Sequence, residues 1–548
     1  GTAASTGGRY QVVTKSPLTG GIACSNSGGY FGAEMKMAGW DMIIFEGRAE
    51  APVYLELRDD EARLVPAADL WGQSTWATEA AIKARAGDPQ MRIASIGNAG
   101  ESGVLYACVV NDEHRAAGRS GVGAVMGSKN LKAVALRGTK GVSVADPAGF
   151  MEATTAAKAV LAGNAVTGEG LPTYGTNVLM NVINEMGALP TRDAQDVQFE
   201  GADNIGGEAM HRPRKTDGKP NLINNQGCFG CTIACGRVSR MDPGHFTVKD
   251  KPQYHRASAG VEYENAWALG AATGVDDLEA LTYCNMLCNE QGMDPISHGA
   301  TVAAAMNLMQ AGAISPDTVG FDLAFGSAEA LVKATEITVA GEGFGVELGQ
   351  GSRRLCETYG RPEFSMTVKS QEFPAYDPRG IQGMGLTYAT SNRGACHLRS
   401  YTVASEVLGI PEKTDPLVTE GKAGLVKVFQ DLTGAVDSAG LCIFTTFAWG
   451  LGDIAPQVAA ACGEDWGEER LMEVGERVWN LERRFNVAAG LTGKDDTLPK
   501  RLLKEAAKTG PAEGQVARLD EMLPEYYQIR GWTADGVPES ATLERLGL

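Results

Sequence analysis

Three closely spaced cysteines are the first residues in this chain whose type and spacing could do chemistry. Cys228, Cys231 and Cys235 lie three and four residues apart, with a glycine on either side of the group. Short Cys-x2-Cys segments bind either zinc or an iron–sulfur cluster, and both centres need a fourth ligand. A chance grouping of buried thiols is the third interpretation, which the flanking glycines and the polar turn at 224–226 disfavour. The spacing alone leaves zinc and iron–sulfur equally open.

Two six-residue segments echo each other and could hold one ligand with two similar halves. Residues 289–294 and 437–442 share the pattern Asp or Asn, two residues, Gly, Leu or Met, Asp or Cys, and each ends a stretch predicted to be helical. Glycine can end a helix and lets the backbone approach a ligand closely. A helix C-cap explains either segment alone, but two in one chain favour a two-part ligand. The second segment also supplies Cys442, a candidate fourth thiol.

Two glycine-rich loops in the first quarter of the chain could bind phosphate. They are residues 25–29 and 114–123, and the second carries Arg115 and Arg119. Backbone N–H groups in such loops donate to phosphate oxygens, and arginine adds bidentate charge. A lone Gly-Gly is more often an ordinary tight turn. The two loops together keep a phosphate-bearing cofactor open as an alternative.

Length and composition favour a soluble protein of several domains. The 548 residues exceed one ordinary core, and 43% apolar and 21% charged residues are typical of globular proteins. The formal net charge of -18 disfavours nucleic acid or an anionic membrane as a partner. The 11 cysteines are odd in number and clustered, which indicates a reducing compartment, the cytoplasm, and no run is long enough for a transmembrane helix. Because the chain begins without Met and a strand follows at once, we expect further residues upstream.

The elements that must position these residues change in type along the chain. Short strands are predicted at 10–14, 41–46, 53–57, 91–95 and 131–136. Amphipathic helices are predicted at 150–161, 278–288, 301–309, 329–340 and 466–485. We therefore expect an α+β fold, with a β-rich domain at 1–143 and two mainly helical domains at 144–366 and 367–548.

Taken in order, the motifs resemble the aldehyde:ferredoxin oxidoreductase family of tungsten–pterin enzymes over essentially the whole chain. The matching stretches are 13–20, 26–29, 115–119, the three-cysteine loop, Glu262-Tyr263-Glu264, 375–380, 393–398, 437–442 and 495–501. Any single match could be accidental, whereas the ordered set is specific to the family. Segment 236–260 looks like an expansion relative to it. Some family members carry a metal between subunits, held by Glu and His, and we do not predict that site here.

The resemblance implies a two-sheet, N-terminally incomplete β domain as the base for a tungsten (or molybdenum) bis-pterin, covered by two helical domains. It implies a [4Fe–4S] cluster bound by Cys228, Cys231, Cys235 and Cys442, and it decides against zinc. The residues implied to bind the pterin cofactor are Arg9, Asn26, Gly28, Arg115, Ala116, Gly118, Arg119, Asn289, Gly292, Asp294, Asp437, Gly440 and Leu441. The backbone carbonyls of Asn26 and Ala116 would bind a magnesium ion between the cofactor's phosphates.

The activity implied is oxidation of an aldehyde to a carboxylic acid, with electrons leaving through the cluster to a ferredoxin. His397 is expected to contact the substrate oxygen, because the unperturbed pKa of histidine lies near neutrality; a lone histidine is more often a core imidazole. Glu262 or Glu264 is expected to be the base, with a pKa raised by burial. On an extended segment the two carboxylates would share a face, so the sequence does not choose between them.

The sequence leaves two other functions open, and it bears on which proteins accept the electrons. One rival is a tungsten-dependent aromatic acyl-CoA reductase of the same family, and the other is a non-enzymatic zinc scaffold with a four-cysteine site. The chain has no second cysteine set and no convincing dinucleotide fingerprint. We therefore expect an oligomer whose electrons pass to a ferredoxin or a ferredoxin-like iron–sulfur subunit, to which an NAD-reducing subunit could be added.

Overall fold

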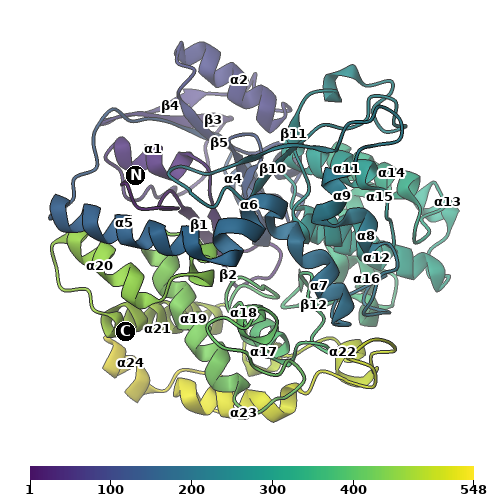
Figure 1. Ribbon diagram of the computed structural model, residues 1–548. Helices are drawn as coiled ribbons and strands as arrows, with labels where there is room; N and C mark the ends of the chain where they lie inside the picture. Colours follow the sequence, from purple (N-terminus) through teal and green to yellow (C-terminus); the bar gives the residue numbers. More distant parts are fainter.

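The β-rich region comes first in the chain and the helices follow, as expected for an α+β fold (Figure 1). The computed structural model describes residues 1–548. Its largest sheet has the strand order β4-β3-β8-β5-β6-β7. The strands are β3 (Val53–Arg58), β4 (Glu61–Pro66), β5 (Arg92–Ser95), β6 (Val109–Asn111), β7 (Arg115–Ala117) and β8 (Leu131–Arg137). A separate antiparallel hairpin pairs β1 (Tyr10–Lys15) with β2 (Ile22–Ser27), which gives the two sheets expected.

The predictions of a strand at 41–46 and of loops throughout 25–29 and 114–123 are wrong, the loops only in part. Residues 41–46 form irregular chain, and Met42 and Ile44 are 70% and 73% exposed. The segment has a strand-like pattern, but no strand pairs with it, so it lacks the ladder that satisfies the backbone of a strand. The loops at 25–29 and 114–123 are partly strand, since they contribute the end of β2 and all of β7.

The five predicted helices are all present. They are α5 (Pro147–Gly163), α11 (Leu278–Gln291), α12 (Pro295–Gln310), α14 (Ala328–Ala340) and α21 (Glu468–Ala488). Helix α5 begins where the Asp146 side chain accepts from Gly149 N, with proline in the first turn. No helix is long and apolar enough to cross a membrane. The boundaries expected at 143 and 366 remain predictions.

The three-cysteine loop joins two strands of a small sheet within the helical region. Strand β9 (Leu222–Gln226) pairs antiparallel with β10 (Gly236–Ser239), so residues 227–235 form the connection between them. Strand β11 (Ser258–Ala259) adds to the other edge of β10. The expanded segment therefore connects β10 to β11, and the loop is held at both ends by paired backbone.

Helices α19 (Lys422–Ser438) and α21 cross with their backbones almost in contact. Gly434 and Gly475 face each other at the crossing, and a side chain at Gly475 would clash with the backbone carbonyl of Asp431. The main hydrophobic core, with 85 buried residues, lies in this helical region and includes Val426 and Leu471 from the two helices. Glycine at the crossing is therefore a packing requirement.

We predict that Gly475→Ala destabilises the protein by about 1–3 kcal/mol, because the added methyl group overpacks the crossing. Gly424→Ala on α19 is the matched control, since no atom lies within 4 Å of a Cβ built there. Alanine at an exposed helix position should be neutral or stabilising by up to about 1 kcal/mol. Thermal unfolding of the two variants tests this, and equal midpoints would contradict the packing argument.

Candidate functional site

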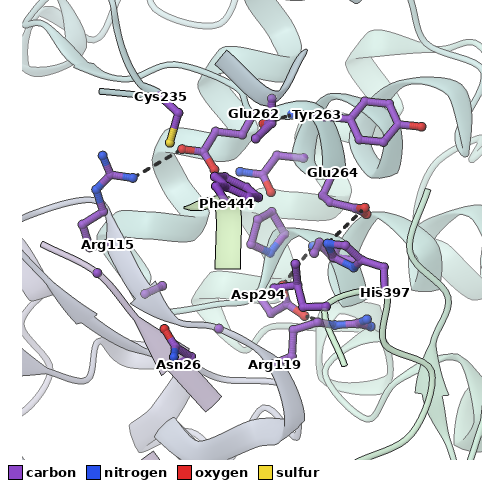
Figure 2. Close-up of a pocket in the computed structure, with 18 of the residues that line it drawn as sticks. Asn26, Arg115, Arg119, Cys235, Glu262, Tyr263, Glu264, Asp294, His397 and Phe444 are labelled. Atoms are coloured by element: carbon purple, nitrogen blue, oxygen red, sulfur yellow. Dashed lines mark hydrogen bonds and ion pairs between the residues drawn. The ribbon is translucent and has the colours of Figure 1, made fainter. Parts of the chain in front are cut away.

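A cavity of about 280 Å³ is lined by both the β-rich region and the helices (Figure 2). Nine of the residues expected to bind a cofactor line it: Arg9, Asn26, Gly28, Arg115, Ala116, Gly118, Arg119, Asn289 and Asp294. His397, Glu262 and Glu264 line the same cavity. The fold thus brings motifs that are far apart in sequence to one place, which we call the central cavity.

A smaller cavity holds part of the second repeated segment. Asp437 lines it together with Arg9, Asn26, Arg393 and Arg399. Three further residues expected to bind the cofactor line neither this cavity nor the central one: Gly292, Gly440 and Leu441. The two cavities share Arg9 and Asn26, so they are neighbouring parts of one site.

Both repeated segments end a helix and place an aspartate beside an arginine. Helix α11 is capped by Gly292, with φ 70°, and Gly440 follows the end of α19 with φ 69°, a region that glycine adopts without strain. Arg119 Nε lies 3.5 Å from Asp294 Oδ2, and Arg399 Nη1 lies 3.5 Å from Asp437 Oδ2. The aspartates stand at opposite ends of the two segments, since Asp294 is the last residue of the first and Asp437 is the first residue of the second. What the segments share in the structure is therefore the glycine that follows a helix.

The four predicted cluster cysteines line a third cavity, here called the four-thiol cavity. Cys228, Cys231, Cys235 and Cys442 surround it. They do not converge on one point, and no trio of His, Cys, Asp or Glu side chains is arranged to hold a single metal ion. Arg9 donates from Nη2 to Cys442 Sγ at 2.8 Å and from Nη1 to Asn26 Oδ1 at 3.2 Å. Arg9 lines all three cavities and so connects the thiols to the rest of the site.

His397 and Glu264 form a buried pair on the opposite side of the central cavity. His397 Nε2 lies 3.4 Å from Glu264 Oε1, and the side chains are 9% and 13% exposed. The other carboxyl oxygen accepts from the backbone N–H of Ala375 at 3.0 Å. The rings of Tyr376 and Tyr401 flank the imidazole at centroid distances of 5.8 and 6.1 Å. One carboxyl oxygen is fixed by the backbone and the other faces the histidine.

Burial moves the two groups of this pair in opposite directions. It raises the pKa of Glu264 to about 8. Burial, together with Arg119 and Arg393, lowers the pKa of His397 well below its usual value. The imidazole is therefore neutral at pH 7, and the carboxyl is the group that titrates near neutrality. This reverses the expectation that His397 is the residue tuned to neutral pH.

The expectation that Glu262 and Glu264 share a face is wrong. Glu262 is extended, with φ −102° and ψ 168°, and helix α10 (Tyr263–Ala266) begins at the next residue. The two side chains therefore diverge, as Figure 2 shows: Glu264 faces His397, whereas Glu262 faces Arg115 with Nη1–Oε1 3.5 Å. Glu262 is also the more exposed of the two, at 39%.

Sequence reasoning missed several side chains that line the site. Arg393 and Arg399 bracket the motif around His397, and their charge was the available signal. Arg399 Nη2 also donates to both carboxylate oxygens of Glu482 at 2.8 and 2.7 Å. The apolar wall of the central cavity includes Leu171, Leu179, Tyr401, Phe444 and Phe447. No motif marks these apolar residues, because any buried core uses the same types.

Comparison with known proteins covers the whole chain. Residues 1–138 match the family model "Aldehyde ferredoxin oxidoreductase, N-terminal domain", and residues 152–548 match "Aldehyde ferredoxin oxidoreductase, domains 2 & 3". The tungsten-containing aldehyde ferredoxin oxidoreductases of Pyrococcus furiosus and Thermococcus kodakarensis are each 48% identical to it over 552 residues, or 100% of this chain and 88% of theirs.

Two more distant proteins show how far the fold extends. The WOR-like subunit of an aliphatic sulfonate oxidoreductase from Pyrococcus furiosus is 27% identical over 99% of this chain and 86% of its own. The active-site complex of benzoyl coenzyme A reductase with 1,5-dienoyl-CoA superposes with a TM-score of 0.82. It is 21% identical and covers 100% of this chain and 87% of its own, so that likeness concerns the fold alone.

Proposed function

Because the chain belongs to the aldehyde ferredoxin oxidoreductase family, we propose that its central cavity oxidises an aldehyde to a carboxylic acid. The observation that carries this proposal is the Glu264–His397 pair, which lies in the same cavity as Arg9. Arg9 in turn contacts the Cys442 thiol. Aldehyde and water yield the acid, two electrons and two protons. The site must therefore accept both electrons and protons, and its side chains can take only the protons.

The residues of the central cavity fit a tungsten-bound pair of pterins with phosphate groups. Arg9, Arg115, Arg119 and Arg393 line it, and Arg119 Nε and Arg393 Nε are buried without a hydrogen-bond partner. Orphaned guanidinium donors suit an anionic ligand rich in acceptors. Asp294 and Asp437 would accept from the two pterins. When bound, this cofactor supplies the two-electron acceptor that the side chains lack.

The four-thiol cavity fits a [4Fe–4S] cluster. Four cysteines are the ligand set that such a cluster requires. A Cβ on Gly28 would lie 2.8 Å from Cys228 Sγ, so glycine there leaves room for a ligand thiol. Arg9 would donate a charge-assisted hydrogen bond to the Cys442 thiolate. Arg9 and Gly28, which line both cavities, would therefore serve the cluster and the pterin.

A magnesium ion between the cofactor's phosphates is part of the same proposal. The backbone carbonyls of Asn26 and Ala116 would bind it, and the two residues line the central cavity together. Asn26 lies in β2 and Ala116 lies in β7, so both positions are held by paired strands. Oxygen ligands are the type that magnesium prefers.

Proton handling falls to Glu264 and His397. We assign Glu264 as the base, because one oxygen is fixed by Ala375 N–H and the other has no hydrogen-bond partner. It would take the proton released when water adds to the carbonyl carbon. Neutral His397 would hold the substrate oxygen through a ring N–H, and Tyr376 and Tyr401, whose hydroxyls are 2.7 Å apart, back the imidazole.

We predict that Glu264→Gln lowers kcat roughly 10²–10⁴-fold while tungsten and iron contents stay unchanged. A base works when deprotonated, and the pKa of Glu264 is about 8, so wild-type kcat should rise with pH and level off above about 8. The variant should lose this rise. His397→Asn should lower turnover but retain the rise of kcat with pH. A wild-type pH profile in Glu264→Gln would refute the assignment.

We predict that Cys442→Ser leaves a damaged or three-iron centre and stops electron transfer to an external acceptor, because one of four ligands is lost. Cys462→Ser is the matched control, since Cys462 is exposed and remote from the thiol cavity's lining. Iron analysis and the visible spectrum compare the two variants. An unchanged iron count in Cys442→Ser would exclude this residue as a ligand.

Electrons would leave to a separate ferredoxin-type protein. Gly230 and Thr232 in the cysteine loop are exposed, so the cluster would lie close to the surface. We predict that the purified chain with aldehyde reduces a ferredoxin or a low-potential dye. It should not reduce NAD, because no dinucleotide fingerprint is present. Direct NAD reduction by the isolated chain would contradict this.

A further inference from the structure

Glu262 and Arg115 form an ion pair at the boundary between the central cavity and the four-thiol cavity (Figure 2). Arg115 and Cys235 line both cavities, whereas Glu262 lines the central one. The Arg115 side chain is 13% exposed, so its charge is poorly screened by solvent. The pair therefore lies where the thiols meet the rest of the site.

Arg115 is fixed in this position by the two strands that flank the cysteine loop. Its Nη2 donates at 3.2 Å to the carbonyl of Gln226, the last residue of β9. Gly236, the first residue of β10, has no side chain, and a Cβ there would clash with the same guanidinium. The hairpin that holds the cysteines thus also holds the arginine against them.

The charges of this pair act on the cysteines rather than on the acid–base pair. Arg115 lines the four-thiol cavity together with Cys228 and Cys235, whereas neither Glu264 nor His397 lines it. Glu264 points the other way, to His397. Glu262 and Glu264 are therefore two residues apart in sequence but serve different halves of the site.

We infer that the Arg115–Glu262 pair sets the reduction potential of the cluster held by the four cysteines, so that Glu262 is an electrostatic positioning residue and not the base. This rests on the proposed function, in which those cysteines hold an iron–sulfur cluster. On reduction the cluster gains one electron, one of the two released by the aldehyde, and passes it to the ferredoxin-type acceptor. A nearby carboxylate opposes that added negative charge, and a guanidinium favours it.

Glu262→Gln in the intact, cofactor-loaded protein tests the inference. Removing the carboxylate charge should favour cluster reduction by up to about tenfold, which is ~59 mV upward for a one-electron couple. Arg115→Gln should shift the midpoint downward. The readout is a potentiometric titration of the cluster followed by electron paramagnetic resonance, which does not depend on turnover.

Glu264→Gln is the matched control, because it is the same substitution two residues away. Its midpoint should equal that of the wild type although its turnover falls. Loss of the wild-type pH rise in Glu262→Gln would return this residue to the role of base and overturn the inference. An unshifted reduction midpoint in Glu262→Gln would also overturn it. If Glu262→Gln loses its iron, Arg115→Gln decides, and a midpoint at or above that of the wild type would overturn the inference. A wild-type chain without four irons would instead overturn the proposed function.

Discussion

The site depends on one buried arginine that ties the β-rich region to the helices. Arg119 is 5% exposed, and its Nη1 donates to the carbonyl of Ala395 at 2.8 Å while Nε lies beside Asp294. The neighbouring Ser120 hydroxyl donates to Gln371 Oε1 at 2.7 Å. Burying a cation is costly, and these contacts offset part of that cost, so they fix how the loop after β7 meets the later chain. The central cavity is what this junction encloses.

Cationic side chains concentrated at the cavity explain its chemistry in an otherwise acidic chain. The whole protein has a formal net charge of -18, yet Arg9, Arg115, Arg119 and Arg393 line the cavity. Their charges suit an anionic cofactor, and burial together with Arg119 and Arg393 keeps the imidazole of His397 neutral. The acidic residues are divided between two tasks. In the proposed function Glu264 handles protons at one end of the cavity, and we infer that Glu262 modifies the charge near the thiols at the other.

Local patterns were sufficient to predict the five helices but not which strands pair. The helix at 278–288 and its glycine cap at Gly292 follow from local propensity, so both were predictable. Segment 41–46 has an equally strong strand pattern, yet a strand also needs a partner, and partner choice is a property of the fold. The ordered motifs predicted which residues gather at the site, because their resemblance to a family carries tertiary information that periodicity lacks.

The finer geometry of the site lay beyond the sequence. Glu262 and Glu264 diverge because a helix begins at Tyr263, whose hydroxyl donates to the distant carbonyl of Ala375. Arg393 and Arg399 gain a role only when α19 and α21 bring Asp437 and Glu482 beside them. Charge and burial at these positions depend on residues 38 to 112 places apart in the sequence, so no local pattern shows them.

The most direct measurement is anaerobic addition of an aldehyde to the purified, cofactor-loaded protein, followed by electron paramagnetic resonance and metal analysis of the same sample. The account predicts tungsten and four irons per chain, and a reduced [4Fe–4S] signal that the aldehyde produces without any added reductant. Zinc in place of iron would contradict it. So would a fully loaded protein whose cluster stays oxidised in the presence of aldehyde but is reduced by dithionite.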